Sequence, residues 1–89
     1  MSGFPLARVA NTRSGWIYTL YSRGESNAFI HALDTRHRVA RCIDLPWKGA
    51  AQNVLQRAVL SLEHGKLMLR QPRGDLLAAI DLRSFGVTT

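Results

Sequence analysis

The stretch "HGKLMLRQPRGDLLAAIDLRSFGV", residues 64–87, contains two short apolar runs on either side of a turn. The runs cover residues 66–70 and 76–81, and the turn between them holds Pro72 and Gly74. Proline presets the backbone for a turn, and glycine permits left-handed turn positions. Short apolar runs bounded by such residues are typical of β-strands. The stretch therefore predicts an antiparallel hairpin that ends at an acidic residue, Asp81.

The same order of features occurs upstream, in "GWIYTLYSRGESNAFIHALDTR", residues 15–36. Gly15 aligns with Gly65 at an offset of 50, and Asp34 aligns with Asp81 at an offset of 47, because the first copy has three additional residues. Few residues are identical, but the apolar positions keep phase through both copies. A period of this length, with three or four short strands in each copy, predicts two successive small antiparallel sheets.

Strand patterns also account for most of the remaining chain. Aromatic and β-branched residues and apolar runs predict strands at residues 16–21, 28–34, 39–45, 58–62, 66–70 and 76–81, followed by a short tail. Pro46 is expected to end the third of these strands. Residues 48–65 also fit an amphipathic helix, because several apolar residues fall near helical spacing. We expect a loop with one helical turn over residues 49–56 and then a strand, because the repeat has a strand there.

The two copies resemble the blades of β-propellers of the YVTN/NHL-like group. The segments His64-Gly65-Lys66-Leu67 and Ala79-Ile80-Asp81-Leu82-Arg83 stand where those blades have a turn and a strand that ends in an acid, and "FIHALDTRHRVARCIDL", residues 29–45, holds these places in the first copy. The resemblance covers most of residues 15–45 and 58–87. It implies an all-β fold of two four-stranded antiparallel blade-like repeats, residues 1–48 and 49–89. The outer strand of the second is incomplete, and His64 replaces the usual turn acid.

Two blades do not close a propeller, which generally needs roughly four to eight. They leave open strand edges and an uncovered apolar face. We expect either that several copies assemble or that the chain belongs to a longer propeller, and we rank a face-to-face sandwich of the two sheets below both. This architecture implies a non-enzymatic structural or protein-interaction scaffold, and self-association is its simplest partnership.

Four residues are predicted to have structural roles in turns: Asp34, Asp81, Gly24 and Gly74. An aspartate that ends a strand can accept hydrogen bonds from backbone N–H groups two residues on. Each glycine permits the turn of an Arg-Gly-acid segment, at residues 23–25 and 73–75. Recognition of residues 73–75 by a cell-surface receptor is the other interpretation, which we weigh below the turn.

The chain is strongly basic. It has 89 residues and a net charge of +6, and ten of its twelve basic residues are arginines. The densest basic group is Arg36, His37, Arg38 and Arg41. Trp16 is expected in the core. Trp47, expected to be exposed in a loop, joins the basic group as a predicted partner-binding residue. A basic module that binds nucleic acid or another polyanion is therefore the alternative function, and the places of the arginines in the folded chain distinguish it from a scaffold.

No pattern in the sequence predicts catalysis or a cofactor. The histidines and Cys42 lack zinc-ligand spacing, and neither a nucleophile elbow nor a phosphate-binding loop occurs. Cys42 is expected to be a small buried thiol in a strand. No apolar run reaches the roughly 18 residues that a membrane-spanning helix needs. The sequence therefore predicts no enzyme, cofactor, metal site or membrane span, and it does not indicate a cellular location.

Overall fold

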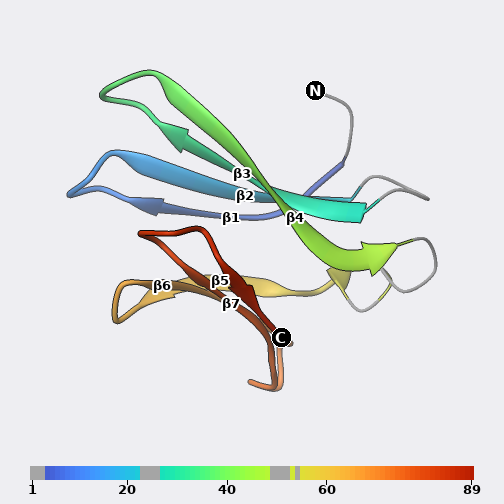
Figure 1. The fold of residues 1–89 in the computed structure, drawn as a ribbon. Helices are drawn as coiled ribbons and strands as arrows, with labels where there is room; N and C mark the ends of the chain where they lie inside the picture. The colour runs from blue at the N-terminus through green and yellow to red at the C-terminus, as the bar shows by residue number, and fades with distance from the viewer. Residues whose placement is uncertain (1–3, 23–26, 49–52, 54) are drawn as a thin grey trace.

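The chain folds into two antiparallel sheets of four strands each (Figure 1). This computed structural model describes residues 4–22, 27–48, 53 and 55–89. The first sheet contains, in order, β1 (Phe4–Asn11), β2 (Trp16–Ser22), β3 (Asn27–Asp34) and β4 (Val39–Lys48). The second contains β5 (Val59–Glu63), β6 (Lys66–Arg70), β7 (Leu76–Asp81) and β8 (Val87–Thr88). The prediction of an all-β fold with two four-stranded antiparallel sheets is confirmed.

One hydrophobic core fills the space between the sheets. Successive side chains of a strand point to opposite faces, so Ala28, Ile30 and Ala32 of β3 share one face, and all three are fully buried. Leu67 and Leu69 of β6 are fully buried in the same cluster. Each sheet therefore covers the apolar face of the other.

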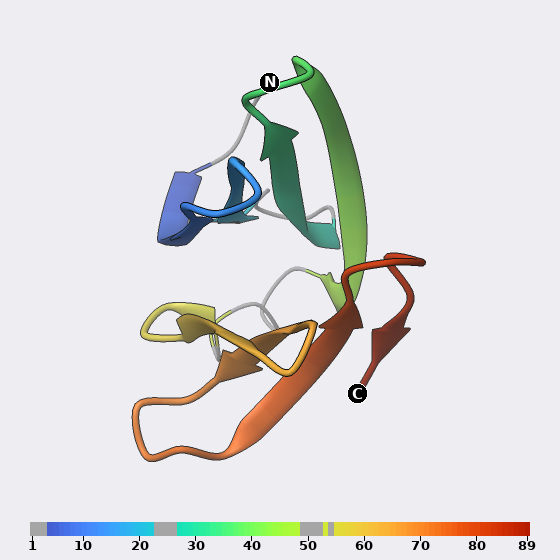
Figure 2. The ribbon, with the colours of Figure 1, turned by 90° about the vertical axis from the view of Figure 1, so that its left-hand side faces the viewer.

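In each sheet the strands lie side by side in the order in which they occur in the sequence, and this order runs the same way across both sheets. The first strands of the two sheets, β1 and β5, contact each other. Figure 2 shows these two strands at one side of the molecule and the last strands, β4 and β8, at the other. The sheets are therefore stacked with first strand near first strand and last near last.

Corresponding glycines make corresponding hydrogen bonds in the two sheets. The carbonyl of Gly15 accepts from the N–H of Thr35 at 3.0 Å, and the carbonyl of Gly65 accepts from the N–H of Leu82 at 3.2 Å. Thr35 and Leu82 each follow the aspartate that ends a strand. Both glycines have a positive φ, 83° for Gly15 and 74° for Gly65. The same backbone link thus joins two neighbouring hairpins in each sheet.

Two expectations for β4 are wrong. Pro46 does not end the strand, which continues to Lys48. β4 is an edge strand, and its register with β3 shifts between Asn27 and Phe29, so this irregular pairing accommodates a residue without an N–H. Cys42 is exposed rather than buried, because its neighbour Ile43 takes the inward position in the alternating strand.

Three further details differ from the sequence interpretation. Trp47 lies in β4 and packs, half-buried, against the core instead of standing in a loop, because the strand is longer than predicted. β1 was not among the predicted strands, because its proline and polar residues obscure the alternating pattern. Of its side chains that the structure describes, Leu6, Ala7 and Val9 contact the core. The helical alternative for residues 48–65 is wrong at β5, which is a strand. Residues 49–52 and 54 lie outside the described residues, and residues 53 and 55 lie in a 3₁₀ turn.

The two corresponding glycines allow a matched test of how closely the hairpins approach. A Cβ on Gly15 would lie 2.9 Å from Cγ of Arg36 and 3.1 Å from Oγ1 of Thr35, whereas a Cβ on Gly65 would meet nothing within 4 Å. Gly65→Ala should cost about 1 kcal/mol, because alanine disfavours a positive φ. Gly15→Ala should cost roughly 1 to 3 kcal/mol more, because the neighbouring loop must also move. Urea unfolding of both variants measures the difference, and equal losses would contradict the close contact.

Candidate functional site

Three hairpin loops of the same design gather at one end of the molecule. They have the sequences "NTRSG" (11–15), "DTRHR" (34–38) and "DLRSF" (81–85), and they connect β1 to β2, β3 to β4 and β7 to β8. In each loop, Oδ1 of the first residue accepts hydrogen bonds from the N–H groups two and three positions later, at 2.7 to 3.2 Å. The fifth residue has a positive φ in all three: Gly15, Arg38 and Phe85. The first side chain therefore fixes the loop conformation, whether it is Asn or Asp.

Asp34 is buried and uses both carboxylate oxygens. Its Oδ1 accepts from the backbone N–H groups of Arg36 and His37, and its Oδ2 lies 2.8 Å from Nδ1 of His37, which donates in this contact. Burial is the largest single effect and raises the pKa of Asp34, but the hydrogen bonds and nearby charge of His37 together with the N–H of Arg36 outweigh it, so the pKa is lowered. This carboxylate is therefore ionised and engaged within its own loop.

Asp81 has the corresponding place in the second sheet. Hydrogen bonds from the backbone N–H groups of Arg83 and Ser84 are the main cause of its lowered pKa, against a smaller opposing effect of burial. The positive charges of Lys66 and Arg83 lower this pKa further. Both strand-ending aspartates are therefore occupied by turn hydrogen bonds.

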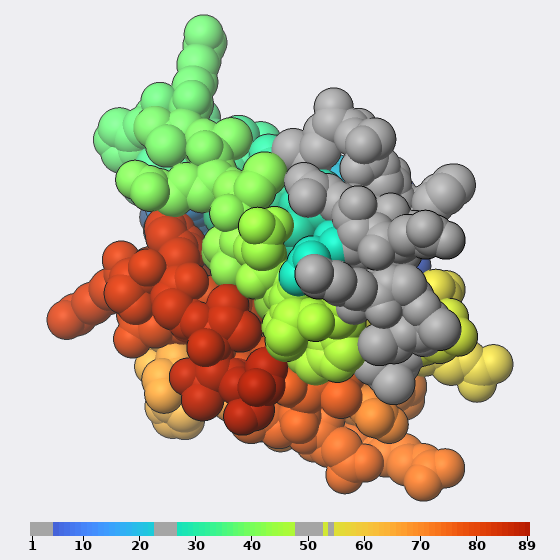
Figure 3. Space-filling view, turned by 45° about the vertical axis from the view of Figure 1, so that its right-hand side comes forward, coloured from blue at the N-terminus to red at the C-terminus, as the bar shows by residue number. Residues whose placement is uncertain are grey.

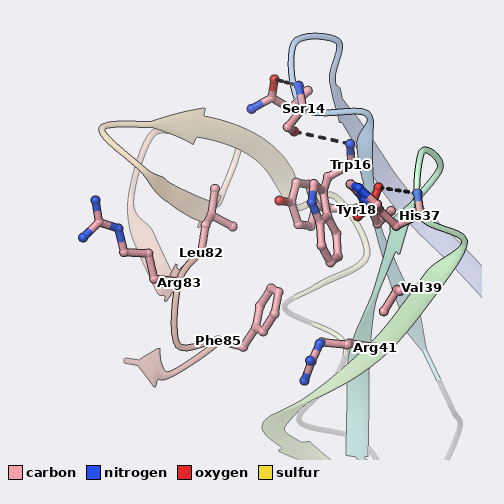
Figure 4. Close-up of a pocket in the computed structure, with 11 residues that line it drawn as sticks. Ser14, Trp16, Tyr18, His37, Val39, Arg41, Leu82, Arg83 and Phe85 are labelled. Atoms are coloured by element: carbon pink, nitrogen blue, oxygen red, sulfur yellow. Dashed lines mark hydrogen bonds and ion pairs between the residues drawn. The ribbon is translucent and has the colours of Figure 1, made fainter.

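A cleft of about 540 Å³ opens between the two sheets beside these loops (Figure 4). One wall comes from the first sheet and the other from the β7–β8 loop. The lining residues include Trp16 and Tyr18 of β2, Val39 and Arg41 of β4, and Leu82, Arg83 and Phe85 of the loop. Figure 4 shows Phe85 facing Trp16 across the cleft, whereas the guanidinium of Arg83 extends away from these rings. The cleft therefore depends on both sheets.

Aromatic rings dominate the contact between the two walls. Trp16 stacks on Tyr18 with ring centroids 6.2 Å apart and an interplanar angle of 10°. Phe85 from the opposite wall lies 5.8 Å from Trp16 at 51°. Cζ of Arg41 lies 5.6 Å from the centroid of Phe85, within range of a cation–π interaction. Burial, with a smaller contribution from Asp34, raises the pKa of the Tyr18 hydroxyl, which therefore stays protonated at neutral pH.

The predicted partner-binding residues divide between the cleft and other places. His37 and Arg41 line the cleft, and Arg36 and Arg38 are exposed on the β3–β4 loop beside it. Trp47 lies near the other end of β4, away from the cleft lining. Figure 3 shows the face of the molecule that contains β4, with the C-terminal segment beside this strand. The structure thus brings together the basic residues of the predicted group but not its tryptophan.

The predicted turn residues are at strand ends or in turns where the chain is described. Asp34 and Asp81 begin two of the three loops, and Gly74 lies in the exposed β6–β7 turn with a φ of 101°. Gly24 lies outside the described residues. Sequence reasoning missed Trp16, Tyr18, Arg83 and Phe85 as cleft residues. The signal that was available is the loop pattern itself, an Asn or Asp followed two residues later by Arg, which occurs three times.

The remaining chemistry of the described residues is limited. They contain no group of three or more histidine, cysteine, aspartate or glutamate side chains that could hold a metal ion. Within the described ranges, no helix has the length and apolar character needed to cross a membrane. The cleft therefore offers aromatic surface and positive charge as its means of recognition.

Comparisons with known proteins give no relative for this chain. It matches no protein-family model, no curated protein and no solved structure.

Asp81 provides a test of the loop design, because Asn11 already has the same role in the β1–β2 loop. Asp81→Ala should lower Tm, since two backbone N–H groups lose their acceptor. Asp81→Asn should keep most of the Tm, since Oδ1 remains. Thermal unfolding measured by circular dichroism compares the two variants, and equal Tm values for both would contradict this role of Oδ1.

The same aspartate predicts a pH dependence. Its pKa in the folded chain is below the ordinary value of 3.8, so its ionisation stabilises the fold above about pH 4, and this stabilisation is lost as the pH falls through the lowered pKa. The Tm of the wild-type chain should therefore fall more steeply between pH 5 and pH 2.5 than that of Asp81→Asn, because the wild-type chain has roughly one more group that takes up a proton in this range. Parallel curves would contradict the contribution of Asp81.

Proposed function

We propose that the chain is a non-enzymatic scaffold unit of a β-propeller, made of two blade-like repeats, residues 1–48 and 49–89, which associates with further copies or further blades. The observation that supports this most directly is that both sheets contain the same backbone link between a positive-φ glycine and the residue after a strand-ending aspartate. The two sheets are also stacked with first strand near first strand and last near last, as adjacent blades would be. Two sheets that are not repeats of one another would have no reason to share the backbone link or the stacking order.

The second sheet has an open edge that fits such association. β8 has two residues and pairs only with Ala79 and Ile80 of β7. Leu76, at the other end of β7, is 51% exposed, and β8 does not reach it. An open edge next to exposed apolar side chains is a surface on which another strand or sheet can add.

The outward faces of the two sheets also have apolar parts. On the first sheet, Tyr21 stacks on Phe29 with centroids 5.1 Å apart, and His31 lies 6.4 Å from Tyr21; Phe29 is fully buried, and Tyr21 and His31 are half-buried. On the second sheet, Val59 is 51% exposed. In a ring of blades these two faces would meet between neighbouring pairs, which would cover the parts of Tyr21, His31 and Val59 that are exposed in the single chain.

The mass of the purified chain in solution tests the scaffold proposal. Since a closed propeller has roughly four to eight blades, light scattering after size-exclusion chromatography should give roughly two to four chains of 9.9 kDa. Leu76→Lys should reduce this mass, because it places a charge at the open edge, whereas Gln56→Lys, an exposed position outside the strands, should not. A folded monomer of the wild-type chain would contradict self-assembly.

A second candidate function, binding of nucleic acid or another polyanion, has support from the distribution of arginines. Five exposed arginines lie in or near the three loops: Arg13, Arg36, Arg38, Arg41 and Arg83. The same loops hold two ionised aspartates, Asp34 and Asp81, which is fewer than the five arginines. The loop end of the molecule therefore has a surplus of positive charge.

A filter-binding assay across salt concentrations tests this second candidate. Binding of single-stranded DNA, double-stranded DNA and heparin should be detectable at low salt and should weaken as salt rises, because each neutralised phosphate releases counterions. The absence of binding to all three polyanions at low salt would end this candidate.

A further inference from the structure

We propose that the cleft between the sheets binds one nucleotide of a single-stranded nucleic acid, with the base against the rings of Trp16 and Phe85 and the adjoining phosphates near Arg41 and Arg83. This proposal rests on the second candidate function above and assigns it a site and a class of ligand. It does not depend on the scaffold proposal.

The first support is the shape and lining of the cleft. A volume of about 540 Å³ lies within the size range of small-ligand sites and has room for a base with its sugar. Trp16 is half-buried, so its ring is held by Tyr18 on one side while it still lines the cleft. An aromatic ring fixed in this way can stack with a planar base at little cost in side-chain entropy.

The second support is the charge around these rings. The guanidinium groups of Arg41 and Arg83 belong to opposite walls, and both residues are exposed. Neither forms a salt bridge within the described part of the chain. Asp34, which is ionised, is the one carboxylate among the residues that line the cleft, so two arginines are present for one negative charge. The cleft therefore favours a ligand that joins a planar ring to negative charge.

The third support concerns the form of the nucleic acid. The rings lie inside a cleft between two sheets, where only an unstacked base can reach them. The described residues contain no α-helix that could enter the major groove of a duplex. Exposed arginines on the neighbouring loops, Arg13, Arg36 and Arg38, extend the positive charge beyond the cleft. A strand with several phosphates therefore fits this surface better than a free nucleotide or a duplex.

Tryptophan fluorescence tests whether a base enters the cleft. In the Trp47→Phe variant, Trp16 is the only tryptophan, since the chain has two. Titration with an oligothymidylate should quench and saturate the Trp16 emission, whereas heparin, which has charge but no aromatic bases, should not. Thymidine monophosphate should quench only at much higher concentration. Quenching by both polymers alike, or by neither while binding is observed, would overturn the proposal.

Paired arginine variants test the role of the walls. Arg41→Ala with Arg83→Ala should weaken oligothymidylate binding at least about fivefold more than Arg57→Ala with Arg73→Ala, a pair of exposed arginines that lines a different hollow. Both pairs lower the net charge equally, and the Tm of each double variant shows that it is folded. Equal weakening by both pairs would overturn the assignment of the cleft and leave general polyanion binding. Absence of binding to any polymer by the wild-type chain would remove both the site and the candidate function.

Discussion

The burial of one apolar sheet face against another is the constraint on which the rest of this structure depends. Leu20 and Ile30 of the first sheet and Leu67 and Ile80 of the second are fully buried in one cluster. Because side chains alternate along a strand, a slip of one residue would bring Thr19 or His31 into this core. The shared core therefore fixes the register of both sheets at once and decides which side chains point into the space between them.

The loops add a second constraint, which acts on the strand ends. In three hairpins an Asn or Asp side chain accepts two backbone N–H groups, and the chain reverses after four residues. With the faces set by the core and the ends set by the loops, Trp16 and Phe85 are brought together from different sheets. The cleft is a consequence of these two constraints rather than of any local sequence motif for binding.

These constraints explain which parts of the molecule the sequence could predict. The strands of both sheets and the turn aspartates are local features, and they follow from alternation and from the chemistry of a strand-ending acid. Whether a strand is an edge is a non-local property, and for this reason the end of β4 was predicted incorrectly at Pro46 and Trp47 was placed in a loop. Cys42 was placed incorrectly because the phase of β4, with Ile43 inward, was not recognised. The meeting of Trp16 with Phe85 depends on how the two sheets stack, which neither stretch encodes by itself.

The scaffold and the cleft make compatible demands on the same chain. The open edge of the second sheet is at Leu76, whereas the β7–β8 loop of the cleft begins at Asp81, at the opposite end of that strand. The outward faces that would stack in a ring are likewise turned away from the space between the two sheets. The proposed association through these surfaces would leave each cleft open. A ring of copies would then present one cleft from every chain, and a single strand that contacts several clefts would bind more tightly than one cleft alone allows, because each further contact forms at a high effective concentration.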